Sequence, residues 1–107
     1  MKRGELYRVS AISKTDTKKQ RVYVIISRQE LINNSYSTLI CAPIYTNYEG
    51  LSTQVQIGVN EGLKHNSAIR CDELISILKT RLTDYVGTLS ETKLFELGQA
   101  LSIAVGI

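Results

Sequence analysis

Arg70 and Asp72 are the two residues whose types and spacing most directly suggest chemistry. They belong to the stretch SAIRCDEL, residues 67–74, which is predicted to be a strand. Side chains two apart in a strand share one face and lie about 6–7 Å from each other. An arginine and a carboxylate at that spacing could flank one phosphate, with a cation for its charge and a carboxylate for a proton. The alternative is an exposed ion pair of little energetic value.

The composition is that of an ordinary globular protein. The chain has 107 residues, of which 43% are hydrophobic and 21% charged, enough to bury one core. We therefore expect a single domain over residues 1–107. No apolar run approaches the roughly 20 residues of a membrane span, and the first residues lack the apolar core of a signal peptide. These features favour a cytoplasmic protein that does not enter a membrane.

Few residues are suited to metal or cofactor chemistry. Cys41 and Cys71 lie inside predicted strands without metal-ligand spacing, so we expect buried, reduced thiols. The chain has one histidine and no obvious carboxylate cluster, which argues against a zinc site. It also lacks a P-loop and a Gly-rich dinucleotide motif. We expect neither a metal nor a cofactor.

The positive charge is concentrated at the N-terminal end. Residues 1–30 hold eight Lys/Arg and three Asp/Glu, or +5, whereas residues 31–107 hold five and seven, or −2. A basic region of this kind suits a polyanionic partner such as a nucleic acid. A solvated basic loop is the simpler explanation.

The hydrophobic pattern predicts a mainly β fold with a C-terminal α-helix. Alternating residues and Val/Ile-rich runs predict strands at residues 5–11, 21–27, 36–45, 53–59 and 67–77. Pro43 cannot donate to a β-ladder, so it marks a bulge or an edge. Residues 13–20 are an expected exposed loop, 28–34 a connection of about one helical turn, and 79–87 an irregular segment. Such a chain forms a small curled sheet or barrel capped by the helix.

The C-terminal helix is predicted to begin after Ser90. A serine suits the N-cap position, and Glu91 is favourable in the first turn. Apolar residues then recur at helical spacing and predict one core-facing stripe, formed by Leu94, Leu97, Leu101, Ala104 and Val105. Gly98 interrupts this segment, at a cost of about 1 kcal/mol unless a close neighbour needs the space.

The order of several short motifs resembles the MazF/PemK toxin family. The RGELY opening at residues 3–7 and the RVYVII strand at 21–26 resemble the family's first two strands. The APIYT stretch at 42–46 is similar to its third strand, and RCD at 70–72 to a triplet of the PemK-like branch. Arg81-Leu82 and the closing helix fit the family's last segment. The likeness extends over essentially the whole chain.

The resemblance implies an SH3-like barrel, of the type shared by CcdB and PemK toxins, that forms a homodimer. Members are ribosome-independent, sequence-specific endoribonucleases of type II toxin–antitoxin systems, also called mRNA interferases. They act on single-stranded RNA without metal, and an antitoxin inhibits them by laying an extended tail over the active groove. The RNA 2′-hydroxyl attacks the adjacent phosphorus and leaves a 2′,3′-cyclic phosphate and a 5′-hydroxyl.

The resemblance, together with the chemistry of the step, suggests four catalytic residues. Asp72 is the candidate base, which burial or hydrogen bonding would have to tune. Arg70 supplies positive charge and a bidentate fork for phosphate oxygens. Arg21 is a second phosphate contact, or alternatively a strand-edge arginine paired to a carboxylate. Thr46 could donate its hydroxyl to a phosphate oxygen, or could be an ordinary strand-end threonine.

Further polar residues are candidates for contacts with the RNA. Amides read base edges well, and the family forms its base pockets at positions that correspond to Asn47, Gln54 and Asn66. Lys18 and Lys19 belong to the basic loop and are candidates for phosphate contacts. His65 could assist proton transfer, although a histidine in such a loop is more often only solvated.

Two other functions are compatible with such a barrel. One is a CcdB-like toxin that binds gyrase, against which the pair Arg70 and Asp72 argues. The other is a nonenzymatic nucleic-acid-binding barrel, or a homologue that has lost its activity.

Overall fold

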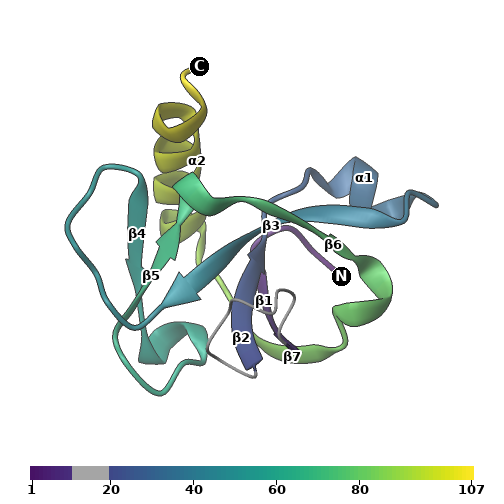
Figure 1. Cartoon of the computed structure of the whole chain (residues 1–107), viewed down its shortest axis with the longest axis horizontal. Helices are drawn as coiled ribbons and strands as arrows, with labels where there is room; N and C mark the ends of the chain where they lie inside the picture. The colour runs from purple at the N-terminus through teal and green to yellow at the C-terminus, as the bar shows by residue number, and fades with distance from the viewer. Residues whose placement is uncertain (11–19) are drawn as a thin grey trace.

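In the computed structural model, which describes residues 1–10 and 20–107, the strands form one curled sheet (Figure 1). The strands are β1 (Glu5–Ser10), β2 (Gln20–Ile25), β3 (Thr38–Tyr45), β4 (Gln54–Ile57), β5 (Ser67–Arg70), β6 (Ile75–Leu78) and β7 (Asp84–Thr88). The helices are α1 (Gln29–Asn33) and α2 (Glu91–Val105), with short 3₁₀ turns η1 (Val59–Glu61), η2 (Cys71–Glu73) and η3 (Lys79–Arg81).

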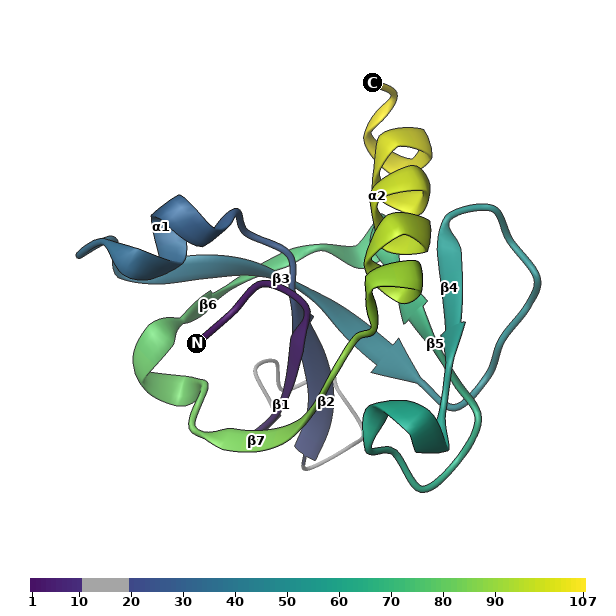
Figure 2. The same cartoon turned by 180° about the vertical axis from the view of Figure 1, so that it is seen from behind.

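The sheet order is β4-β5-β3-β2-β1-β7, and β6 also pairs with β3. Every pairing is antiparallel. Helix α2 packs near β4 and η2 at one end of the sheet, as the two opposite views show (Figures 1 and 2). The predicted class, a mainly β fold with a small curled sheet or barrel and a C-terminal α-helix, is confirmed.

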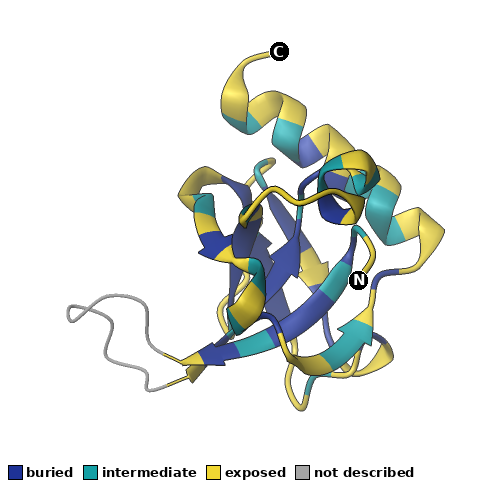
Figure 3. Cartoon of the chain, turned by 90° about the vertical axis from the view of Figure 1, so that its right-hand side faces the viewer, coloured by how far each residue is buried: buried dark blue, intermediate teal, exposed yellow. Residues whose placement is uncertain are grey.

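Both faces of the central strands are buried, because the sheet curls around one group of side chains and α2 covers another. In β2, Val24 contributes to the cluster beneath α2, whereas Tyr23 and Ile25 belong to the cluster on the other face. In β3, Ala42 and Ile44 face the first cluster and Leu39 and Cys41 the second. Figure 3 shows buried residues concentrated in the strands of the sheet and much of the C-terminal helix exposed. The near-continuous apolar runs of both strands follow from this double burial.

The predicted strand from Ser67 to about Ile77 is wrong, because the chain turns at η2. Strand β5 pairs with β3 through Ile44 and Ile69, and in that register a continuous strand would place Asp72 opposite Cys41. Ile75 stands there instead, three residues further along. Turn η2 contains the extra residues. Arg70 and Asp72 therefore do not share the face of one strand.

Pro43 lies in the centre of the sheet, at a point where a missing N–H is tolerated. On one side it faces Tyr23 of β2. On the other side β3 pairs with β6 as far as Cys41 and with β5 from Ile44 onward. The sequence predicts a bulge or an edge at Pro43. The structure instead has a short interval in β3, between its pairing with β6 and its pairing with β5.

Strand β7 is the element that the sequence pattern misses, because residues 79–87 do not alternate regularly and Asp84 and Gly87 are weak β-formers. It is held by pairing with β1 and by a close backbone approach to η1. Gly62 has a φ of +94°, and a Cβ on Gly87 would collide with the carbonyl oxygen of Glu61. Two glycines allow these segments to cross.

Helix α2 has the expected N-cap, and the structure adds a glycine C-cap. The Ser90 side chain accepts a hydrogen bond from the Lys93 N–H at 3.2 Å, and Gly106 ends the helix in the left-handed conformation. Leu97 is buried, and Leu94, Leu101 and Ala104 pack against the core, but Val105 is 53% exposed, so its assignment to the stripe is wrong. No helix of residues 1–10 and 20–107 is long and apolar enough to cross a membrane.

The two cysteines are free and buried, as expected. Burial raises the pKa of Cys41 to about 12. Burial, and secondarily the charge of Asp72, raises the pKa of Cys71 to about 11. Both thiols therefore stay protonated at neutral pH and have low nucleophilic reactivity.

We expect Gly98→Ala to stabilise the protein by up to about 1 kcal/mol, since glycine is a poor helix former. No atom outside the helix's own backbone and Gly98's chain neighbours lies within 4 Å of a Cβ built at this position. Urea denaturation of the wild type and the variant measures the difference. An unchanged or lower free energy of unfolding would contradict the open space around Gly98.

The opposite result is expected for Gly87→Ala, which places the same methyl group against the Glu61 carbonyl. Overpacking of this kind typically costs about 1–3 kcal/mol. The same denaturation experiment, with Gly98→Ala as the matched control, tests it. Wild-type stability of Gly87→Ala would show that β7 and η1 do not approach closely.

Candidate functional site

A pocket of about 250 Å³ lies where β2, β3 and the segment before β5 meet. Its charged lining side chains are Arg8, Arg21 and Lys64, and its described lining contains no Asp or Glu. We call it the basic pocket; it is lined by Arg8, Gln20, Arg21, Val22, Ile44, Tyr45, Thr46, Gly62, Leu63, Lys64, His65 and Ser67. Arg8 also forms an exposed ion pair with Asp84 at 3.5 Å. A concave site of this charge is suited to an anionic ligand.

Arg21 is held at the start of β2 with only 9% of its surface exposed. One guanidinium nitrogen donates to the Ile44 carbonyl at 3.3 Å, and the guanidinium carbon lies 4.0 Å from the centroid of the Tyr45 ring. The pairing explains the contact: Tyr23 faces Pro43, so the same register places Arg21 opposite Tyr45. The Arg21 side chain is thereby fixed in the wall of the basic pocket.

Arg70 contacts the same tyrosine from the strand on the other side of β3. Its guanidinium carbon lies 3.7 Å from the Tyr45 centroid, because Ala68 faces Tyr45 and Arg70 is its diagonal neighbour. Arg70 is also paired with Glu73 at 3.1 Å and with Glu49 at 3.6 Å. Two carboxylates therefore offset its charge, and Arg70 is not part of the basic pocket's lining.

Tyr45 connects the two arginines to Glu73. Its hydroxyl donates to Glu73 Oε1 at 2.9 Å, while Glu73 Oε2 accepts from Arg70. Burial, followed by the hydrogen bond to Glu73, raises the pKa of Tyr45, and the charges of Arg21 and Arg70 act in the opposite direction. The phenol therefore remains protonated and can keep its hydrogen bond to Glu73. We call Arg21, Tyr45, Arg70 and Glu73 the arginine–tyrosine cluster.

Asp72 is separate from this cluster and from the basic pocket. It is exposed on η2 and accepts a hydrogen bond from Thr53 Oγ1 at 2.6 Å. Arg70 forms its ion pairs with Glu49 and Glu73 rather than with Asp72. Arg70 and Asp72 are therefore bonded to different partners, and their placement beside one phosphate stays a prediction.

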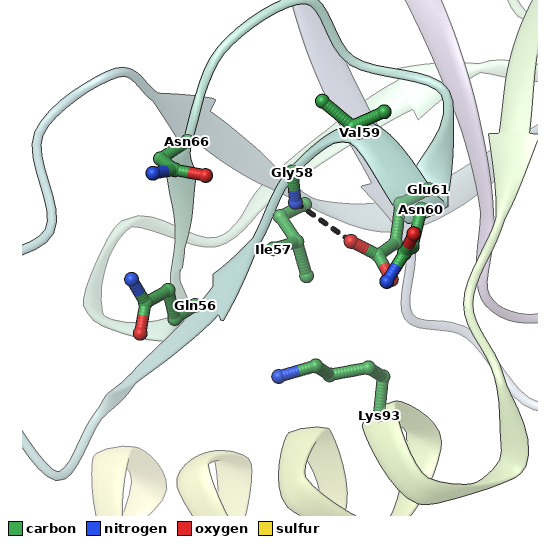
Figure 4. A pocket seen from close by; sticks show the side chains of 8 residues that line it. All are labelled: Gln56, Ile57, Gly58, Val59, Asn60, Glu61, Asn66 and Lys93. Atoms are coloured by element: carbon green, nitrogen blue, oxygen red, sulfur yellow. Dashed lines mark hydrogen bonds between the residues drawn. The ribbon is translucent and has the colours of Figure 1, made fainter.

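The other expected site residues are distributed over several places. Thr46 and His65 line the basic pocket together with Arg21. Asn47 is exposed in the loop after β3, and Asn66 lines a second pocket (Figure 4). Gln54 is buried and its amide is bonded to Glu49, accepting from the backbone N–H at 2.9 Å and donating to Oε1 at 3.2 Å. Lys18 and Lys19 lie outside the described residues.

Sequence reasoning missed Tyr45, Glu73 and the pocket-lining Arg8 and Lys64. Of these residues, only Glu73 had a signal in the local sequence, because it follows Arg70 by three residues. The contacts of the others depend on which strands are neighbours in the sheet. In residues 1–10 and 20–107, no three His, Cys, Asp or Glu side chains gather closely enough to hold a metal ion.

Comparisons with solved structures reveal several proteins of the same fold. An endoribonuclease from Mycobacterial species in complex with its cognate antitoxin has a TM-score of 0.85 at 20% identity, over 100% of this chain and 96% of that one. The Mycobacterium tuberculosis toxin MazF-mt6 has a TM-score of 0.83 at 23% identity, over 96% and 97%. MazF from Deinococcus radiodurans has a TM-score of 0.77 at 15% identity, over 100% and 97%. At these identities the likeness concerns the fold.

The sequence itself provides the family assignment. Among curated proteins, none matches this sequence. A family model described as PemK-like, MazF-like toxin of type II toxin–antitoxin system matches residues 2–105. The curled sheet, the C-terminal helix and the order of the motifs agree with that match. The chain belongs to the family of PemK-like, MazF-like toxins of type II toxin–antitoxin systems.

Proposed function

We propose that this protein is an endoribonuclease toxin that cleaves single-stranded RNA at preferred sequences, without a metal and without the ribosome. The observation that carries the proposal is the basic pocket, in which Arg21, Thr46 and His65 lie together. A guanidinium and a hydroxyl can both donate to phosphate oxygens. Fixed donors directed at developing negative charge are an effective form of transition-state stabilisation.

In the proposed reaction, the 2′-oxygen bonds to phosphorus and the bond from phosphorus to the 5′-oxygen breaks. The 2′-hydroxyl loses its proton to a base, and the leaving 5′-oxygen gains one. The products are a 2′,3′-cyclic phosphate and a 5′-hydroxyl, with no other reactant. Arg21 and Thr46 hold the phosphate oxygens, and His65 in the same pocket is positioned to move a proton.

Arg70 has an indirect role in this proposal. Its contacts with Tyr45, Glu49 and Glu73 make it a positioning residue for Tyr45 and hence for Arg21. Asp72 is retained as an alternative base, acting from η2, where it is exposed to solvent.

We also propose a cognate antitoxin as inhibitor and a homodimer as the active form, in the cytoplasm. The family is defined by its toxin–antitoxin systems, and one structural relative is described in complex with its cognate antitoxin. In this chain, Phe95 and Ile103 of α2 are 68% and 55% exposed. Exposed apolar side chains on one helix are compatible with a protein partner.

We expect Arg21→Lys to lower RNA cleavage by about 10²–10³-fold, because lysine keeps the charge and loses the planar fork. Thr46→Val should also lower the rate, since it replaces the hydroxyl by a methyl group and so removes the proposed hydrogen bond to the phosphate. The measurement is cleavage of a long defined RNA in EDTA with mapping of the cut ends, which should carry cyclic phosphate and 5′-hydroxyl groups. Arg28→Ala, an exposed arginine outside the basic pocket, is the control.

Three outcomes would count against this assignment. Full activity of Arg21→Lys, together with loss of activity in Asp72→Asn, would move the site to η2. Intact RNA from folded wild-type protein would contradict the nuclease and favour a gyrase-binding or binding-only toxin. Cleavage that stops in EDTA and returns with added metal would contradict the metal-independent reaction.

For Tyr45 we expect a difference between two substitutions. Tyr45→Phe keeps the ring under both guanidiniums and loses only the bond to Glu73, so it should retain most of the activity. Tyr45→Leu removes the cation–π contacts, which are worth about 0.5–2 kcal/mol each, and should lower kcat more than it raises KM. Equal activity of both variants, with matched circular dichroism spectra, would show that the ring does not position Arg21.

A further inference from the structure

A second pocket, of about 300 Å³, lies between the end of β4, the turn η1 and the first turns of α2. Figure 4 shows Gln56 and Asn66 on one side, Asn60 and Glu61 on the other, and Lys93 extending from α2 beneath them. We call it the amide pocket; it is lined by Gln56, Ile57, Gly58, Val59, Asn60, Glu61, Asn66 and Lys93. Its volume is at the lower end of the range of about 300–1,000 Å³ for small-ligand sites.

The charged groups of the amide pocket already have partners. Glu61 is buried, and its Oε1 accepts the Gly58 N–H at 2.6 Å. Lys93 forms an ion pair with Glu96 at 3.4 Å. The pocket therefore has little net charge to offer, which disfavours a phosphate as its main ligand.

The amides, in contrast, are available. Within the part of the chain that the structure describes, the side chains of Gln56, Asn60 and Asn66 are exposed and make no hydrogen bond. Each amide carries donors and an acceptor side by side. Val59, 73% exposed, adds an apolar surface next to them. A flat, neutral ligand with donors and acceptors along its edge fits this combination.

One segment of the chain lines both pockets. Gly62, Leu63, Lys64, His65 and Ser67 line the basic pocket, whereas Asn66 lines the amide pocket. Consecutive Cα atoms are about 3.8 Å apart, so His65 of one lining and Asn66 of the other are direct neighbours along the chain. This adjacency is the basis for assigning a phosphate to the basic pocket and a neighbouring base to the amide pocket.

We propose that the amide pocket holds one unpaired base of the RNA and determines which base is accepted at one position beside the cut. The inference rests on the proposed nuclease function and adds Gln56 and Asn60 to Asn66 as base-reading residues. Recognition is by hydrogen bonds from the amides to the base edge, and the face of the base packs on Val59.

Gly58 provides a test that does not remove an amide. A Cβ at this position would lie 3.0 Å from Asn66 Oδ1. Apart from its chain neighbours, no backbone atom lies within 3.4 Å of that Cβ. Gly58→Ala should therefore displace the Asn66 amide.

The experiment has two measurements on the wild type and on Asn66→Ala, Gln56→Ala and Gly58→Ala. The first is deep sequencing of cut sites in a randomised RNA, where the three variants should lose the wild-type preference at one position and still cut. The second is the Kd for an uncleavable oligonucleotide of the preferred sequence, 2′-deoxy at the attacking position. Loss of a bidentate base contact should weaken binding about 5- to 150-fold.

Gln99→Ala is the matched control, because Gln99 is an exposed amide on α2 outside this pocket's lining. It should keep the wild-type profile and affinity. Unchanged profiles and Kd values in all three pocket variants would overturn the proposal. If the wild type cuts no RNA, the nuclease function fails, and the Kd is then measured with a randomised 2′-deoxy oligonucleotide instead. Weaker binding by the three pocket variants than by the wild type and Gln99→Ala would support a base in the amide pocket, and equal binding would overturn it.

Discussion

Strand β3 pairs with β2 along one side and, on its other side, first with β6 and then with β5. One strand can pair with two successive partners only if the segment that connects those partners takes up the change of register. The three residues of η2, between β5 and β6, do this. Pro43 lies in the interval between the two partners, where its missing N–H is tolerated. The sheet can therefore curl around a second core cluster, and β5 brings Arg70 beside the end of β3.

That end of β3 carries Tyr45, and the site is organised around its ring. Arg21 and Arg70 arrive from neighbouring strands on either side, and two like charges at one ring would repel without compensation. The electron-rich face of the ring attracts both, and Glu49 and Glu73 offset the charge of Arg70. The positive charge of the basic pocket then comes from Arg8, Arg21 and Lys64.

The two pockets that segment 58–67 lines differ in chemistry. The basic pocket offers cations and the Thr46 hydroxyl, which suit the repeating, sequence-independent part of a nucleic acid. The amide pocket offers Gln56, Asn60 and Asn66, which suit its variable part. Under our proposals, segment 58–67 lines both the pocket for cleavage and the pocket for base recognition, and the close contact of Gly62 with Gly87 holds it in place. Loss of that contact should therefore affect cleavage and recognition together.

The sequence by itself determined whatever depends on local pattern. Helix α2 and its Ser90 cap, the buried central strands, the buried thiols and the ordered motifs of the toxin family all follow from residue types at short spacing. Tertiary structure alone decided the break after Arg70, the pairing of β7 with β1, and the meeting of Arg21 with Arg70 at Tyr45. Periodicity indicates which face of an element is buried, but not which strand lies beside it. Register and partner are set by long-range pairing, and the site is made of contacts between partners.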